Sequence, residues 1–310
     1  MDLLFIAAGL AGLFFGGDRL VAGAVGLAHR AGLPPLVIGL TIVGFGTSTP
    51  ELLTSLRAAF LDSPGIAIGN VVGSNIANIL LILGLAALVA PMAVERRALL
   101  RDGPALALAT LAGAALIWID MLGRTGGLIL LGGLATYLAI ALRAPGPDDS
   151  APTEEAAAPA RLFPAVGQFA LGLVATLIGA HLLVTGGISL ARSLAVPETI
   201  IGLTIVAVGT SLPELATSLI AARRGHAEVA IGNVIGSNIF NLLGILGATA
   251  AVSPISAPPG TIGADLAVML GATALLLWVA ATDRRISRRE GAILLGLYVG
   301  YILWLALRAA

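Results

Sequence analysis

Long apolar stretches alternate with short polar ones along almost the whole chain. A helix needs about 20 mostly apolar residues to cross a bilayer, and ten segments approach or exceed that length. The pattern therefore predicts ten membrane-spanning helices, five in each half. The segments are 3–27, 35–60, 65–90, 98–118, 124–143, 164–190, 198–222, 228–252, 262–281 and 289–308.

One stretch of sequence occurs twice within these apolar segments. Residues 38–84 align with residues 201–247 at a constant offset of 163, with 31 identities in 47 positions and no gap. Each copy contains GTS-x-PE, followed by GN-V-x-GSNI-x-N. Because each half has an odd number of predicted helices, the second copy enters the membrane in the opposite sense to the first. We therefore expect an all-α membrane protein of ten transmembrane helices, arranged as two inverted five-helix repeats.

The two predicted repeats are separated by a stretch that has no apolar periodicity. It is rich in Pro, Ala and acidic residues, a composition typical of a flexible linker. The expected organisation is a first five-helix repeat at 1–143, a short cytoplasmic linker at 144–161, and a second, inverted repeat at 162–310.

Composition and charge support a membrane protein and indicate its orientation. A hydrophobic fraction of 58%, only 11% charged residues and a mean hydropathy of +1.01 exclude ordinary soluble globular proteins. With no cysteine, the chain has no disulfide and no thiolate nucleophile. The basic residues are all Arg, and most fall in alternate loops, which the positive-inside rule places in the cytoplasm. Both termini are then expected on the extracytoplasmic side of the cell membrane.

Each copy of the repeat is expected to contain a broken helix. Pro50 lacks a backbone N–H and clashes with the preceding turn, and Gly44 and Gly46 lower the helix propensity just before it. Gly209 and Pro213 reproduce this arrangement in the second copy. Broken backbone at membrane depth is tolerated where it is buried in protein or lines a wet cavity, and its carbonyls can coordinate a cation.

The polar side chains of the repeat recur at a spacing of four residues, which favours one face of a helix. Oxygen ligands with two carboxylates suit calcium, and neutral oxygens beside a carboxylate also suit sodium. Two carboxylates about 5 Å apart repel by roughly 3 kcal/mol at an effective dielectric near 20, so they favour a bound cation. Buried protonated acids or helix-packing amides are the alternative interpretation. The pairs are Thr47/Glu51, Thr210/Glu214, Ser74/Asn78 and Ser237/Asn241.

With both motifs present in both halves, the sequence resembles the cation/calcium exchanger superfamily, specifically its prokaryotic sodium/calcium exchanger branch. The resemblance covers nearly the whole chain. It implies that the segments carrying Glu51 and Glu214 cross near the centre, with calcium between them. It also implies a secondary active antiporter that exchanges sodium for calcium by alternating access, without enzyme chemistry. The first segment of each half is the implied moving gate.

The resemblance also assigns roles to individual positions of the repeat. Many relatives have Asp where this chain has Asn241, and losing that acid weakens the case for potassium cotransport. The implied calcium ligands are Glu51, Glu214, Thr47 and Thr210. The implied sodium and central-site ligands are Ser48, Ser211, Ser74, Ser237, Asn78 and Asn241, with the backbone carbonyls of Gly44 and Ala207.

Other functions remain open at this point. A proton/calcium or other divalent-cation antiporter would use the carboxylate pair to carry protons. A passive cation channel would need no countertransported ion, and a non-transporting membrane scaffold would leave the duplicated acids unexplained. No cofactor is expected. The expected partners are the transported calcium and sodium ions and the lipid bilayer, with no nucleic acid and no obligate protein partner.

Overall fold

The computed structural model describes residues 1–143, 162–194, 207–256 and 262–309, which are almost entirely helical. The elements of the first half are α1 (Asp2–Ala31), α2 (Pro35–Ile38), the π-helical turn η1 (Gly39–Val43), α3 (Gly44–Thr47), α4 (Thr49–Phe60), α5 (Pro64–Ala77), the π-helical turn η2 (Asn78–Leu83), α6 (Gly84–Val89), β1 (Met92–Ala93), α7 (Arg96–Trp118) and α8 (Arg124–Ala141). Those of the second half are α9 (Leu162–Ser193), α11 (Ala207–Gly209), α12 (Leu212–Arg223), α13 (Ala227–Ile239), the π-helical turn η4 (Phe240–Ile245), α14 (Leu246–Val252), α15 (Gly263–Thr282), β2 (Arg285–Ile286) and α16 (Arg288–Ala309).

The described residues form an all-helical membrane protein, as the apolar pattern predicts. Within them, eight helical stretches are long and apolar enough to span a bilayer, and the pair Pro35–Thr47 and Thr49–Phe60, bent by 45°, is a ninth if taken as one span. The predicted segment 198–222 is described only from residue 207, as α11 and α12. The predicted linker 144–161 lies outside the described residues.

The predicted helix break is present in the first copy of the repeat. Helix α3 ends at Thr47, and α4 begins at Thr49 with Pro50 in its first turn. Ser48 lies between them with φ −80° and ψ 10°. The π-helical turn η1, which was not predicted from the sequence, directly precedes α3. Isolated π-helical turns are rare and are frequently found at functional sites.

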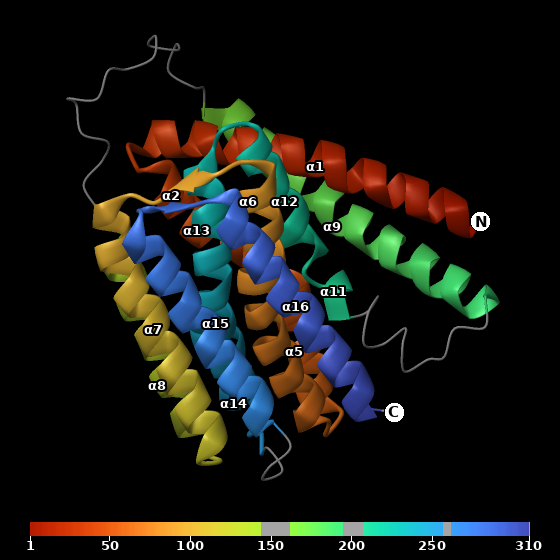
Figure 1. Ribbon diagram of the computed structural model, residues 1–310, viewed down its shortest axis with the longest axis vertical. Helices are drawn as coiled ribbons and strands as arrows, with labels where there is room; N and C mark the ends of the chain where they lie inside the picture. The colour runs from red at the N-terminus through yellow and green to blue at the C-terminus, as the bar shows by residue number, and fades with distance from the viewer. Residues whose placement is uncertain (144–161, 195–206, 257–261, 310) are drawn as a thin grey trace.

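Helices α1 and α9 lie side by side and are inclined to the other long helices (Figure 1). Small residues bring their backbones into contact: a Cβ added at Gly9 would lie 2.5 Å from the Leu183 backbone nitrogen, and one added at Gly16 would lie 2.5 Å from that of Thr176. Rising residue numbers in α1 meet falling numbers in α9, so the two helices are antiparallel. Such glycine contacts are typical of close helix packing in membranes.

The helices that carry the second motif of each repeat occupy the centre of the molecule. In the most apolar 18-residue stretch of Ala227–Val252, 94% of the residues are buried, and in that of Pro64–Val89 the share is 78%. The corresponding share in α16 is only 17%, so α16 lies at the periphery. The repeated polar residues are therefore held inside the protein, away from lipid.

A short antiparallel strand pair joins two loops at one end of the bundle. Met92 pairs with Ile286, and Ala93 pairs with Arg285. The pair brings the start of α7 beside the start of α16, and both starts carry Arg residues. Two of the Arg clusters thus lie at the same end of the protein.

Candidate functional site

The two acidic side chains of the repeat are buried, and each is held by a serine from the other half. Glu51 and Glu214 are each 1% exposed. The Ser211 hydroxyl donates to Glu51 Oε1 at 3.0 Å, and the Ser48 hydroxyl donates to Glu214 Oε1 at 2.8 Å. The second oxygen of each carboxylate, Oε2, is buried without a hydrogen-bond partner. Each carboxylate therefore has one free oxygen available to a cation.

The two threonines of the first motif also approach the acid of the opposite half. Thr210 interacts with Glu51, and Thr47 interacts with Glu214. Thr47 Oγ1 also lies 3.1 Å from the Val43 carbonyl oxygen. Thr47 Oγ1 also lies 3.3 Å from Asn233 Oδ1, so this hydroxyl takes part in a further contact between the halves.

Two asparagines that were not predicted as site residues, Asn70 and Asn233, hold the backbone at the acids. Asn70 Nδ2 donates to the Glu51 carbonyl oxygen at 3.0 Å and to Ser55 Oγ at 2.9 Å. In the second half, Asn233 Nδ2 makes the equivalent contacts with the Glu214 carbonyl oxygen at 3.3 Å and with Ser218 Oγ at 3.0 Å. Asn233 and Ser218 stand 163 residues after Asn70 and Ser55, which is the offset of the repeat. This recurrence was the sequence signal that could have identified them.

The serines and asparagines of the second motif also meet across the halves. Asn241 Nδ2 donates to Ser74 Oγ at 3.0 Å, and the Ser237 hydroxyl donates to the Gly44 carbonyl oxygen at 3.3 Å. Asn78 Nδ2 donates to Asn238 Oδ1 at 3.0 Å.

These contacts leave further oxygens inside the protein unpaired. The Oδ1 atoms of both Asn78 and Asn241 are buried without a hydrogen-bond partner. The two amide oxygens therefore add to the free carboxylate oxygens of the interior.

The two backbone positions predicted to coordinate ions both lie at the short helices of the breaks. The Gly44 carbonyl oxygen, at the start of α3, accepts hydrogen bonds from the Ser48 N–H and the Ser237 hydroxyl. Ala207 lies in α11, at the point where the described residues resume. Ser48 at the first break and the motif residues of α13 therefore lie close to Glu214 and to the Gly44 carbonyl.

The chemistry of this interior is that of an oxygen-lined cation site. Among the described residues, no group of three or more His, Cys, Asp or Glu side chains could hold a metal ion. A cation bound between the halves would therefore be held by two carboxylates and neutral oxygens, a set that suits calcium and sodium. The two carboxylates also repel each other, which favours a bound positive charge.

Comparisons with known proteins find similarity over nearly the whole chain. The sequence model of the family described as "Sodium/calcium exchanger protein" matches residues 1–143 and 164–307. The chain is 35% identical over 349 residues to the sodium/calcium exchanger MaX1 of Methanosarcina acetivorans, with 97% of each chain covered. It is 36% identical over 310 residues to the inner membrane protein YrbG of Escherichia coli K12, covering 96% of this chain and 94% of that protein.

A solved structure of the sodium-calcium exchanger NCX_Mj has the same fold. It superimposes with a TM-score of 0.85 at 34% identity and covers 98% of both chains. Its likeness extends through both halves, including the helices that carry the paired acids. This chain therefore belongs to the sodium/calcium exchanger protein family, whose members are membrane ion exchangers rather than enzymes.

Proposed function

We propose that this protein exchanges sodium for calcium across the cell membrane by alternating access. One observation carries the proposal: among the described residues, five side-chain oxygens are buried without a hydrogen-bond donor. Four of them belong to the proposed ligands, namely Oε2 of Glu51 and Glu214 and Oδ1 of Asn78 and Asn241, and the fifth is Asn75 Oδ1. A buried acceptor without a partner costs about 1–3 kcal/mol, and more when it is charged. A cation ligated by these oxygens would remove that cost, and family membership makes the cation the transported substrate.

The proposed calcium ligands are the two acids and the threonines that approach them. Glu51 and Glu214 supply the negative charge, and Thr47 and Thr210 supply neutral oxygens. Calcium takes six to eight oxygen ligands in flexible geometry. A divalent ion neutralises both carboxylates at once, so it binds more strongly there than a monovalent ion.

The proposed sodium and central-site ligands surround the same acids, which makes sodium and calcium compete. Ser48 and Ser211 already touch the carboxylates through their hydroxyls. If sodium ions occupy sites that use these carboxylates, calcium cannot bind at the same time, which is the physical basis of antiport. The other proposed ligands are Ser74, Ser237, Asn78 and Asn241, with the carbonyls of Gly44 and Ala207.

The proposed architecture is two inverted five-helix repeats, 1–143 and 162–310, joined by a cytoplasmic linker at 144–161. The antiparallel packing of α1 on α9 supports the inversion, because these are the first helices of the two halves. The exchange of serine–glutamate hydrogen bonds between halves supports a two-fold relation. In this architecture α1 and α9 are the moving gate.

The proposed orientation places both termini on the extracytoplasmic side. The β1–β2 pair supports it, because it sets the Arg residues at the starts of α7 and α16 at one end of the protein. Arg-rich loops favour the cytoplasmic side.

Asn241 adds no acid to the centre, which supports sodium coupling without potassium.

Equilibrium binding of ⁴⁵Ca²⁺ to the purified protein tests the ion assignment. We expect sodium to displace calcium cooperatively, whereas potassium and choline should not. Glu51→Gln should lose calcium binding, and Glu228→Gln should retain it, because Glu228 is an exposed acid in the first turn of α13. Displacement by protons but not by sodium would contradict sodium coupling and favour the proton/calcium alternative.

A further inference from the structure

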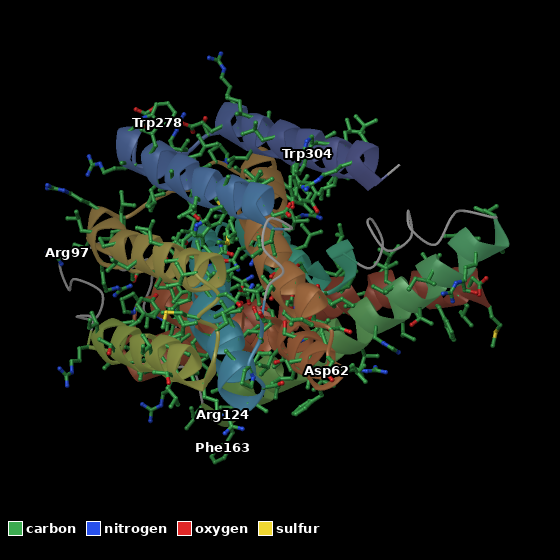
Figure 2. All side chains as sticks on the ribbon, turned by 90° about the horizontal axis from the view of Figure 1, so that it is seen from below. Asp62, Arg97, Arg124, Phe163, Trp278 and Trp304 are labelled. Carbon is green, nitrogen blue, oxygen red and sulfur yellow. The ribbon has the colours of Figure 1, made fainter. Side chains whose placement is uncertain are left out.

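A groove that the ion-exchange mechanism does not use lies between α15 and α16. Its volume is about 410 Å³, and its walls are almost entirely apolar. Trp304, which borders it, lies on α16 at the periphery of the helix assembly (Figure 2). The groove therefore faces the surroundings of the protein. Its main lining residues are Leu80, Gly271, Gly296, Gly300, Tyr301 and Trp304.

Glycines on both helices create the groove. A Cβ added at Gly271, Gly296 or Gly300 would meet no atom within 4 Å. The start of α16 is different, because a Cβ at Gly291 would lie 2.7 Å from the Gly84 carbonyl oxygen. Helix α16 therefore packs tightly near its start and leaves open space near its end. Gly296, Gly300 and Trp304 recur every four residues, so they share the face of α16 that forms the groove wall.

The end of the groove carries aromatic rings and a positive charge. The Arg308 guanidinium lies 5.4 Å from the centroid of the Trp304 ring. The Tyr301 hydroxyl donates to Asp265 Oδ1 at 2.8 Å, so the acid nearest this end already has a hydrogen-bond donor. Aromatic rings and Arg near the end of a spanning helix are typical of the membrane interface. The groove thus combines an apolar trough with a mouth that carries Arg308 and an acid already hydrogen-bonded to Tyr301.

We propose that this groove binds one anionic phospholipid, with an acyl chain along the glycine face and the phosphate beside Arg308. An apolar groove on a membrane-spanning surface is filled by hydrocarbon rather than by water, because a dry apolar cavity offers water no polar partners. The positive charge of Arg308 complements the phosphate of an anionic headgroup. The proposal rests on membrane insertion and not on the identity of the transported ions.

A bound acyl chain would also contact η2, the helical turn that carries a proposed ion ligand. Leu80 lines the groove and belongs to η2, the turn that begins at Asn78. Helices α15 and α16 both pack against η2. A lipid in the groove therefore supports the helix that presents a proposed ion ligand.

Native mass spectrometry of the delipidated protein, titrated with dioleoyl phosphatidylglycerol or dioleoyl phosphatidylcholine, tests the proposal. We expect one tightly bound phosphatidylglycerol, with a preference of about fivefold over phosphatidylcholine from one Arg contact. The double variant Gly296→Leu/Gly300→Leu fills the groove and should lower lipid affinity by about tenfold or more. The matched control Gly132→Leu/Gly167→Leu, at exposed glycines with open space on α8 and α9, should bind as the unmodified protein does.

Arg308→Gln tests the headgroup separately from the fold of the groove. It should abolish the preference for phosphatidylglycerol and leave phosphatidylcholine binding unchanged. The proposal is overturned if the preference survives Arg308→Gln, if the filled-groove variant binds lipid like the control, or if the groove is covered by a second copy, seen as a lipid-free dimer. ⁴⁵Ca²⁺ binding by each variant, measured in parallel, separates failure of this proposal from failure of the ion assignment.

Discussion

Replacing Glu214 by Gln removes one negative charge from the proposed site with little change of shape. Glu214 is 1% exposed, and its Oε1 accepts the Ser48 hydroxyl at 2.8 Å. A glutamine oxygen can accept the same hydrogen bond, so the contact between Ser48 and residue 214 should persist. The charge is what changes, and ions of different valence should respond differently to its loss.

The expected magnitude follows from Coulomb's law. A unit charge about 4 Å from a carboxylate at an effective dielectric near 20 gains about 4 kcal/mol, and a divalent ion gains about 8 kcal/mol. Desolvation of the buried ion offsets much of either gain. We therefore expect Glu214→Gln to weaken calcium binding by at least about 3 kcal/mol, or more than about a hundredfold, and sodium binding by about half that free energy.

Two isotope-exchange assays in proteoliposomes measure this difference. Calcium/calcium exchange with ⁴⁵Ca²⁺ and sodium/sodium exchange with ²²Na⁺ each give a half-saturating concentration for the variant and for the unmodified protein. Glu228→Gln, which removes an exposed carboxylate, controls for the loss of one acid and should leave both values nearly unchanged. Equal fold-losses for the two ions would refute the charge argument, and unchanged calcium exchange would remove Glu214 from the site.

Three further substitutions test other parts of the account. Asn233→Ala leaves the buried Glu214 carbonyl without its side-chain donor, so the unfolding free energy should fall by about 1–3 kcal/mol; an unchanged Tm in detergent would contradict this. Gly16→Leu places a side chain against the backbone of α9, and we expect lost ⁴⁵Ca²⁺ uptake with calcium binding retained; normal uptake would argue against α1 and α9 as the gate. Asp18→Asn breaks a partly exposed ion pair with Arg224 and should change stability by less than about 1 kcal/mol; complete loss of uptake would place Asp18 on the ion path instead.

Local sequence chemistry was sufficient to predict where the backbone breaks. Pro50 cannot continue a helix from the preceding turn, and the observed interruption lies at Ser48, two residues earlier. The apolar lengths likewise predicted the spanning helices to within a few residues at most ends, because the bilayer thickness fixes the length that a helix needs.

The partners of the site residues were beyond local reasoning. Spacing relates Glu51 to Thr47 within one segment, but it does not reveal that Glu51 accepts the hydroxyl of Ser211, 160 residues away. Nothing in a local pattern encodes which turn of a distant helix will face it. The role of Asn70 depends on the same tertiary packing, since its amide holds the Glu51 carbonyl across the α4–α5 contact.

The π-helical turns and the strand pair had no local sequence signature. The turn η2 begins at Asn78 within a run of Ile and Leu residues that an ordinary α-helix would accommodate equally well. The β1–β2 pair joins two loops almost 200 residues apart, and each strand has only two residues. Both features depend on the packing of complete helices.

The most direct test of the central claim is ⁴⁵Ca²⁺ uptake into proteoliposomes loaded with sodium and diluted into sodium-free buffer, with parallel pH-gradient and potassium controls. The account predicts rapid uptake that requires the outward sodium gradient, is unaffected by potassium and is abolished by Glu51→Gln. Uptake driven by a proton gradient without sodium, or uptake indifferent to every counter-gradient, would contradict sodium/calcium exchange.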